Sequence, residues 1–194
     1  SASSKIFSNA FSVSKEDLPW LSELKKTGKD RFSEVGFPAP GNEAWKYTSL
    51  NSLSRVDWTD AIAEYDVGEL PWLSEAGAYR LVLVNGRFDS KLSDIGKLPE
   101  GAFIGSFTEA LSSHVEMMES HLCTIASSED SPLLALNAAQ MADGYVILLK
   151  DLQLTRPIEI LNLGQSNGEA IAFHPRNLII IDQQSEALSL KHIS

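Results

Sequence analysis

The sequence of 194 residues has few of the features that define secreted and membrane proteins. It contains a single cysteine, Cys123, so no disulfide can form within the chain, and this favours a reducing compartment. It contains no Asn-x-Ser/Thr site for N-glycosylation. No apolar run approaches the roughly 18 residues that a membrane-spanning helix needs. The sequence therefore predicts a cytoplasmic protein that does not enter a membrane.

Positive charge is scarce in the second half of the chain. Residues 1–97 carry 12 Lys and Arg against 14 Asp and Glu, a net charge of −2. Residues 98–194 carry 4 against 12, a net charge of −8, and together the halves give the −10 of the whole chain. An acidic half repels phosphate backbones, so we do not expect nucleic acid to be a partner.

Motifs that identify common enzymes are also missing. The sequence has no Gly-rich phosphate loop, Cys-x-x-Cys, His-Glu-x-x-His or Gly-x-Ser-x-Gly. These absences count against nucleotide-binding enzymes, zinc enzymes and serine hydrolases. We predict no catalytic, cofactor-binding or metal-binding residues, and no enzymatic activity.

Scattered residues of suitable chemistry have simpler structural explanations. His114, Met118 and His121 would share one face of a helix expected over 106–126, but two histidines seven apart lack the usual i, i+4 ligand spacing. We expect them to be partly buried, and Cys123 to act as a small hydrophobe.

Three further sets of residues also have structural explanations. His174, in the turn before an Ile-rich run, is interpreted as a corner residue bonded to the backbone. The four tryptophans are interpreted as packing anchors rather than a ligand cage, because burial of the indole dominates small cores. Four acids in the second half form no close pair suited to glycosidase chemistry. The tryptophans are Trp20, Trp45, Trp58 and Trp72, and the acids are Asp151, Glu159, Asp182 and Glu186.

A helix is predicted from about Leu18 to the glycine at position 36. Its apolar positions recur at spacings of three and four, and Gly28 among them marks a close crossing or a break. Gly36 suits a left-handed helix end, at which Phe32 and Phe37 would touch. The apolar positions are Leu21, Leu24, Gly28, Phe32 and Val35.

The segment Phe37–Thr48 follows as a rigid corner. Pro38 prevents the helix from continuing, and Asn42 can cap a new helical turn that begins at Glu43. Two aromatic residues and a lysine would then pack into a short turn.

The middle of the chain has clear turn and cap signals. Asn85-Gly86 between extended runs predicts a β-hairpin near 79–90. A short extended piece at 102–105 should precede a capping box of Ser106 and Glu109, which begins the helix over 106–126. Ser131 or Asp130 can cap a further helix that begins at Pro132 and extends to about residue 141.

From Tyr145 onward the pattern changes to short apolar runs with brief interruptions. None of the gaps can hold a crossover helix, which excludes a βαβ sheet and leaves a sandwich or a coiled parallel β-solenoid. The last run, 188–193, alternates apolar and polar residues. A solenoid ending there would have an open edge, so we expect further rungs in a longer protein, or pairing through this end in a homodimer. The expected runs are 145–149, 158–163, 170–173, 178–181 and 188–190.

Four blocks in the right order carry a family resemblance. Phe37-Pro38 followed by Glu43-Ala44-Trp45-Lys46-Tyr47-Thr48 resembles the N-terminal part of the SufB/SufD family of iron–sulfur cluster assembly proteins, and favours its SufD branch. Residues 81–88 are similar to the family's hairpin. Residues 132–144 are similar to its helix before the solenoid, and residues 156–158 and 174–179 to its first rungs.

This resemblance implies an α+β fold, in which an N-terminal helical region leads into the first rungs of a right-handed parallel β-helix. The expected parts are a flexible tail over 1–14, a helical region over 15–143 with the hairpin near 79–90, and an incomplete β-helix core over 144–194. The family's later rungs and C-terminal helical region, with its proposed cluster-site residues, have no counterpart in this sequence.

The resemblance also implies a role. The chain would belong to a non-catalytic scaffold subunit of the SUF complex, acting with a SufB-like paralogue and a SufC-like ABC ATPase that binds a C-terminal region. No cofactor is expected in this fragment, because the iron–sulfur cluster would be assembled transiently by the full complex. The alternatives are a β-solenoid carbohydrate-active enzyme and a stand-alone protein-binding adaptor.

Overall fold

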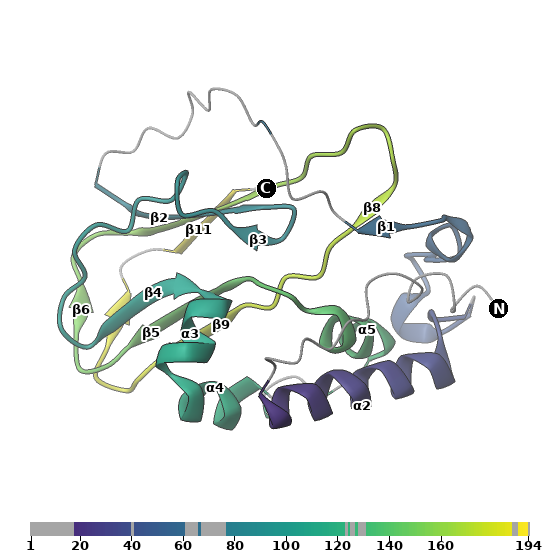
Figure 1. Ribbon diagram of the computed structural model, residues 1–194, viewed down its shortest axis with the longest axis horizontal. Coiled ribbons are helices and arrows are strands. Elements are labelled where there is room, and N and C mark those ends of the chain that lie inside the picture. The colour runs from purple at the N-terminus through teal and green to yellow at the C-terminus, as the bar shows by residue number, and fades with distance from the viewer. Residues whose placement is uncertain are drawn as a thin grey trace. The chain divides into compact units, whose positions relative to one another are not determined.

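The computed structural model describes residues 18–39, 41–60, 66, 77–122, 124, 127, 131–187 and 190–193 (Figure 1). The chain forms a mixed α+β fold, as predicted, and divides into two compact units. The helical unit comprises Ser1–Ala61, Glu116–Met141 and Ser166–His174, and the strand unit comprises Ile62–Val115, Ala142–Gln165 and Pro175–Ser194. The tail expected over 1–14 lies outside the described residues.

Two helices form the centre of the helical unit: α2 (Pro19–Val35) and α5 (Pro132–Gln140). They cross at Gly28, where an added Cβ would lie 2.7 Å from the Ala135 carbonyl oxygen and 2.9 Å from the Ala139 nitrogen. The prediction that Gly28 marks a close crossing is therefore confirmed. The Ser131 hydroxyl accepts from the Leu133 N–H and caps α5, also as predicted.

The C-terminal end of α2 has the predicted positive φ and ring contact, but the ψ of Gly36 is −160°, not that of a left-handed helical residue. Gly36 adopts a φ of 64°, and the Phe32 and Phe37 rings meet edge to face with centroids 5.3 Å apart. Phe32 is fully buried with Ala135 and Leu136, and Trp58 packs against them, as expected of a packing anchor. Val35, expected on the apolar stripe, is instead 38% exposed, because it is the last residue of the helix.

The remaining elements of the helical unit are short. They are the 3₁₀ turns η1 (Glu43–Trp45) and η2 (Leu53–Arg55), the strands β1 (Thr59–Asp60) and β8 (Ile171–Ala172), and most of α4 (Val115–Leu122). The strands β1 and β8 pair in parallel, with Thr59 opposite Ile171. Sequence reasoning expected an extended run near β8 but missed β1.

The strand unit contains the predicted hairpin. Strand β2 (Tyr79–Val84) pairs antiparallel with β3 (Arg87–Phe88). Asn85 and Gly86 have φ values of 51° and 76°, the left-handed values that a type I′ turn requires at both central positions. The hairpin prediction is confirmed.

The rest of the strand unit is built from two sheets and a separate strand pair. The strand order is β11-β7-β2-β3 in one sheet and β4-β5-β9 in the other, and β10 pairs with β6. The core lies between the sheets, where Leu81, Ile147 and Ile160 are at most 1% exposed. The new strands are β4 (Ala102–Ser106), β5 (Tyr145–Leu149), β6 (Gln153–Leu154), β7 (Ile158–Leu163), β9 (Leu178–Ile181), β10 (Glu186–Ala187) and β11 (Leu190–Ile193).

Three parallel strand pairs share nearly the same sequence spacing. Residue 146 on β5 pairs with residue 178 on β9, 32 positions later. Residue 153 on β6 pairs with residue 186 on β10, 33 positions later, and residue 158 on β7 pairs with residue 190 on β11, again 32 positions later. The chain therefore passes twice through the same three strand positions, without a helix between them.

The single helix predicted over 106–126 is wrong. The structure has α3 (Phe107–Ser113) and then α4, with His114 between them at φ −135° and ψ 41°. The Ser113 hydroxyl lies 2.9 Å from the Glu109 carbonyl oxygen and 2.7 Å from His114 Nδ1. Such local side-chain bonds compete with helical ones, which explains a break at this point. The predicted cap at the start of α3 is confirmed, since the Ser106 hydroxyl accepts from the Glu109 N–H.

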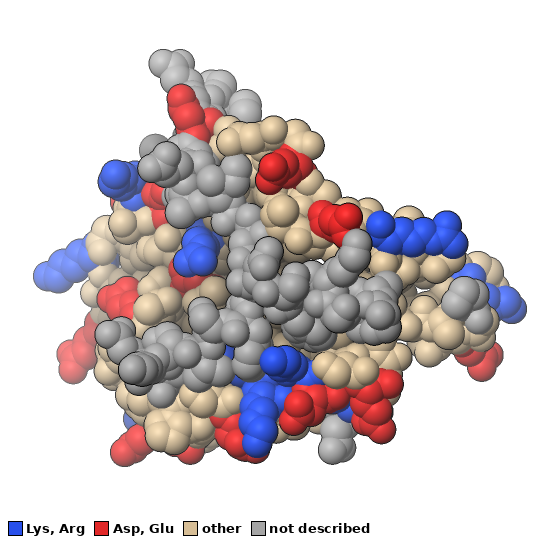
Figure 2. Space-filling model, turned by 45° about the vertical axis from the view of Figure 1, so that its right-hand side comes forward, with Lys and Arg blue, Asp and Glu red and all other residues tan. Residues whose placement is uncertain are grey.

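No helix among the described residues combines the length and the apolar character needed to cross a membrane. On the face drawn in Figure 2, the described Lys and Arg side chains are interspersed with Asp and Glu, and neither sign forms one continuous patch there.

Candidate interaction surfaces

The first candidate surface is the corner, Phe37–Thr48, of which the structure does not describe residue 40. The Asn42 side chain accepts from the Ala44 N–H at 3.1 Å and caps η1, as predicted. The Trp45 and Thr48 N–H groups donate to the Asn42 and Trp45 carbonyl oxygens at 3.0 Å each. These successive turn bonds explain why so short a segment holds a defined shape.

The corner presents its side chains differently from the prediction. Trp45 is half-buried, but Tyr47 is 92% exposed, so the expectation that both aromatics pack into the turn is wrong for Tyr47. The Lys46 ammonium lies 5.6 Å from the centre of the Tyr47 ring, within cation–π range. A pocket of about 140 Å³ lies beside them, lined by Pro38, Ala39, Gly41, Trp45, Lys46, Thr48, Ser49 and Leu50.

The second candidate surface is the open edge, defined as strands β9, β10 and β11. Each is the last strand of its sheet in the part of the chain that the structure describes. On β9, Ile179 is 39% exposed and Ile181 is 42% exposed. Their pairing partners on β5, Ile147 and Leu149, are 0% and 1% exposed. The apolar side chains that are buried on β5 therefore have partly exposed counterparts on β9.

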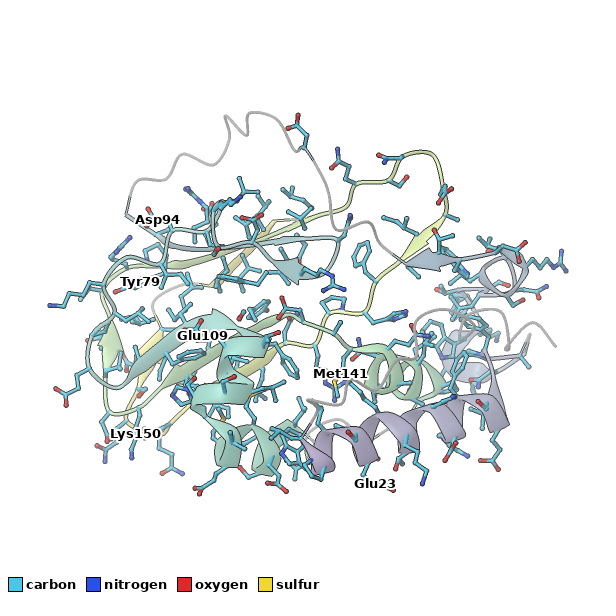
Figure 3. All side chains as sticks on the ribbon, in the orientation of Figure 1. Glu23, Tyr79, Asp94, Glu109, Met141 and Lys150 are labelled. Carbon is cyan, nitrogen blue, oxygen red and sulfur yellow. The ribbon has the colours of Figure 1, made fainter. Side chains whose placement is uncertain are left out.

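Glu159, one of the four acids considered above, forms a partly buried ion pair. Its carboxylate accepts from Arg80 Nε at 2.7 Å, and the two side chains are 6% and 15% exposed. Glu159 on β7 and Arg80 on β2 are register partners. Arg80 also forms an isolated antiparallel β-bridge with Asp94, which lies near Tyr79 at the start of β2 (Figure 3). The pair links two parallel strands and is placed to fix their register.

Asp143, which follows α5, is a structural centre that the sequence analysis did not identify. Its carboxylate accepts from the Phe88 N–H at 2.9 Å and from the Thr108 hydroxyl at 3.1 Å, while its carbonyl accepts from the Arg176 N–H at 2.9 Å. The side chain therefore joins β3 and α3, and the backbone carbonyl of the same residue joins the segment before β9. A Cβ on the next residue, Gly144, would overlap the Arg176 carbonyl. In the sequence, only the dipeptide Asp143-Gly144, which is typical of a turn, marks this position.

The prediction that His114 and His121 share one face of a single helix is wrong. His114 follows α3 and stacks on Phe103, with ring centroids 4.5 Å apart. His121 belongs to α4, where its Nδ1 lies 3.0 Å from the Met117 carbonyl oxygen. Met118 is fully buried, in line with its core interpretation. Among the described residues, no three His, Cys, Asp or Glu side chains form a group that could hold a metal ion. Cys123 and Trp72 lie outside the described residues.

The other candidates occupy separate structural positions. Glu186 accepts from Gln153 Nε2 at 2.9 Å, and Asp182 accepts from the Gln184 N–H at 2.7 Å. Asp151 lies in a turn at a φ of 55°. Trp20, Trp45 and His174 are all half-buried.

Electrostatic perturbation is clear at one tyrosine of the strand unit. Tyr145, 7% exposed at the start of β5, has its phenol in the core, and burial raises its pKa above the ordinary value near 10. The side chain therefore acts as a core residue. Glu109 on α3 lies beside β4 (Figure 3), close to Gly105.

Comparison with known proteins identifies the family. The family model described as the SufBD protein N-terminal region matches residues 5–160. The chain belongs to the SufBD family. The SufBD match covers the corner, the hairpin and the chain through to the first half of β7. It thereby confirms the family resemblance seen in the sequence.

A curated SufBD relative has a similar sequence. A protein from Synechocystis sp. (strain ATCC 27184 / PCC 6803 / Kazusa), described as an iron–sulfur cluster assembly SufBD family protein, is 26% identical over 170 residues. The aligned region covers 86% of this chain and 37% of the relative. The chain thus spans little more than a third of the SufBD relative that it matches.

Proposed function

We propose that this chain is the N-terminal part of a scaffold subunit in a SUF iron–sulfur cluster assembly complex. The observation that carries the proposal is the SufBD match over residues 5–160, together with a relative described as an iron–sulfur cluster assembly SufBD family protein. The Glu43–Thr48 block favours the SufD branch. The subunit would act with a SufB-like paralogue and a SufC-like ABC ATPase, and the cluster is cargo of the full complex rather than a resident cofactor of this chain.

The proposed architecture is the start of a right-handed parallel β-helix. The support is the repeated spacing of 32 or 33 residues in three separate parallel strand pairs. Strands that follow one another around a coil pair with their equivalents one coil later, which gives such a constant spacing. Residues 144–194 would supply the first rungs.

The proposed role is non-catalytic and located in the cytoplasm. Among the described residues, the carboxylate of Glu159 pairs with Arg80, and that of Asp143 bonds the backbone and Thr108. A carbohydrate-active enzyme would need two carboxylates facing one substrate bond.

One observation favours an adaptor role instead: Tyr47 is 92% exposed beside a pocket, and exposed aromatics anchor many protein interfaces.

Affinity purification of the tagged protein, expressed in its own host with its genomic neighbours, tests the role. We expect an ABC ATPase and a SufBD paralogue to co-purify in near-stoichiometric amounts. Isolation of a stable, monodisperse protein that lacks both partners at low salt would contradict the proposal, and turnover of a polysaccharide would favour the enzyme.

A variant pair tests the adaptor alternative. If the corner recruits the partner, Tyr47→Ala should abolish co-purification while Val35→Ala, at an exposed apolar residue outside the corner, leaves it unchanged. Retention of both proteins by Tyr47→Ala would exclude the corner as the docking site.

A further inference from the structure

The dipeptide Asn-Gly occurs twice in the chain, as Asn85-Gly86 and as Asn167-Gly168. This pair is prone to spontaneous deamidation, because glycine has no Cβ to hinder the approach of its nitrogen to the asparagine side chain. The two copies have the same local chemistry but different surroundings in the fold. Asn85 is 3% exposed at the tip of the β2–β3 hairpin, whereas Asn167 is exposed in the segment between β7 and β8.

Deamidation needs an adaptable main chain and water. The glycine nitrogen gives up its proton and attacks Cγ of the asparagine, so that a C–N bond forms, the bond from Cγ to Nδ2 breaks, and ammonia leaves with a proton from solvent. Water then opens the five-membered imide at either carbonyl carbon, which gives aspartate or isoaspartate. The product is about 1 Da heavier and carries one more negative charge, and no oxidant or reductant takes part.

Asn85 is held in a conformation that prevents this reaction. In a type I′ turn, ψ at the first central residue is about +30°, which places the next nitrogen across the Cα–C bond from Cβ, so the ring cannot close until the turn opens. The Asn85 N–H donates to the Leu163 carbonyl oxygen at 2.8 Å, and its Oδ1 accepts from the Gln165 N–H at 2.8 Å. The Asn85 Nδ2 is buried, so the leaving group is also kept away from solvent.

Asn167 lies in open surroundings. The residues on either side of it are exposed as well, namely Ser166, Gly168 and Glu169. Gly168 has a φ of 92°, and a Cβ added there would meet no described atom within 4 Å apart from its chain neighbours. Both the space for the imide ring and the water for its hydrolysis are therefore available at Asn167.

We propose that Asn167 is a site of spontaneous deamidation in the folded protein, and that Asn85 becomes such a site only when the strand unit opens. Reaction at Asn167 adds a negative charge two positions before Glu169, whose carboxylate accepts from the Thr59 hydroxyl at 3.5 Å beside the β1–β8 pair. Reaction at Asn85 puts a carboxylate or an extra main-chain methylene into a buried two-residue turn. A strand unit that has opened is thereby chemically marked, and the mark hinders its return to the native hairpin.

Peptide mapping of the 194-residue chain tests the inference. Folded protein and protein in urea are incubated at the same mildly alkaline pH and temperature, then digested with an acid protease, and fragmentation locates the gain of about 1 Da. In the folded protein, we expect Asn167 to deamidate about tenfold or more faster than Asn85, because Asn85 reacts only through opened molecules. In urea, where the turn is absent in both cases, the two rates should agree within about threefold.

Asn167→Gln is the matched control, because glutamine would have to close a larger ring. It should remove the fast product and leave the rate at Asn85 unchanged. Labelling by an isoaspartate methyltransferase gives a second readout, which should mark the folded parent chain and not the folded variant.

Two outcomes overturn the inference. The first is an Asn167 that reacts no faster than Asn85 in the folded protein. The second is a rate difference that persists in urea, which would assign it to neighbouring residues in the sequence rather than to the fold. Both readouts use the chain alone, so they are independent of partner co-purification and of the scaffold proposal.

Discussion

The two units are stabilised by contacts of different kinds. In the helical unit, the central contact is a helix crossing at Gly28, and each helix is specified by its own caps and apolar spacing. In the strand unit, the β2–β3 hairpin is local, but the other strand pairings join residues 32 to 79 positions apart, such as Tyr79 with Ile158. Caps, turns and apolar spacing specify the individual elements in both units. The contacts that join the elements differ: a close helix crossing in one unit, and strand pairs in the other. Substitutions should therefore act through close packing in one unit and through strand pairing in the other.

The largest effect is expected at the helix crossing. Gly28→Val places atoms where the Ala135 carbonyl oxygen and the Ala139 nitrogen already lie, and neither backbone atom can move freely. We expect a loss of about 3 kcal/mol in unfolding free energy, at the upper end for overpacked cores. Urea denaturation measures it. Thr27→Val, at an exposed position of the same helix, is the control, and equal stability of the two variants would disprove the close crossing.

The next largest effect is expected at the ion pair between β2 and β7. Glu159→Ala leaves the Arg80 guanidinium partly buried without its partner, which should cost about 2–3 kcal/mol in unfolding free energy. The double variant Arg80→Met/Glu159→Leu should recover most of this loss, because no charge is then stranded. A double variant as unstable as the single one would show that the pair does more than fix the register.

A smaller effect is expected at the start of α3. Ser106→Ala removes the acceptor for the Glu109 N–H, and should cost about 1 kcal/mol of unfolding free energy. Ser106→Asp retains an acceptor and should lie within a few tenths of a kcal/mol of the parent. Thermal unfolding compares the three proteins, and an alanine variant of unchanged Tm would show that the cap is dispensable.

The smallest effect concerns alkaline pH. Burial raises the folded-state pKa of Tyr145 above the unfolded value near 10, so the unfolded chain loses this proton first as pH rises. The linked stability is intact below pH 10 and falls as pH rises from there through the folded-state pKa. Tyr145→Phe should flatten this part of the stability curve in urea titrations between pH 8 and pH 11. An unchanged slope would show that another group controls the decline.

Local signals predicted most elements correctly. The Asn85-Gly86 turn and the cap at Ser106 follow from short-range chemistry, and both are confirmed. At Gly28 the sequence left a close crossing or a break open, and the structure has the crossing. The helix break at His114 was missed, because the spacing of apolar residues continued through it. The spacing of apolar residues gives no indication of the hydrogen bonds that the Ser113 hydroxyl forms with its neighbours.

Long-range contacts were beyond sequence reasoning. The pairing of β1 with β8, the Arg80–Glu159 pair and the Asp143 bonds all join segments far apart in the chain. A two-residue strand such as β1 has no period to detect. The exposure of Tyr47 was also missed, because an aromatic residue in a turn is ordinarily expected to be buried.

The interleaving of the two units has a consequence for biosynthesis. Neither unit is a continuous stretch of chain, and Thr59 of β1 must wait for Ile171 of β8, 112 positions later, before it can pair. At the roughly 5–20 residues per second of translation, that wait is about 6–22 seconds. During this time the emerging segments cannot complete their cores on the ribosome. We therefore expect nascent chains of this protein to depend on chaperones until both units can close.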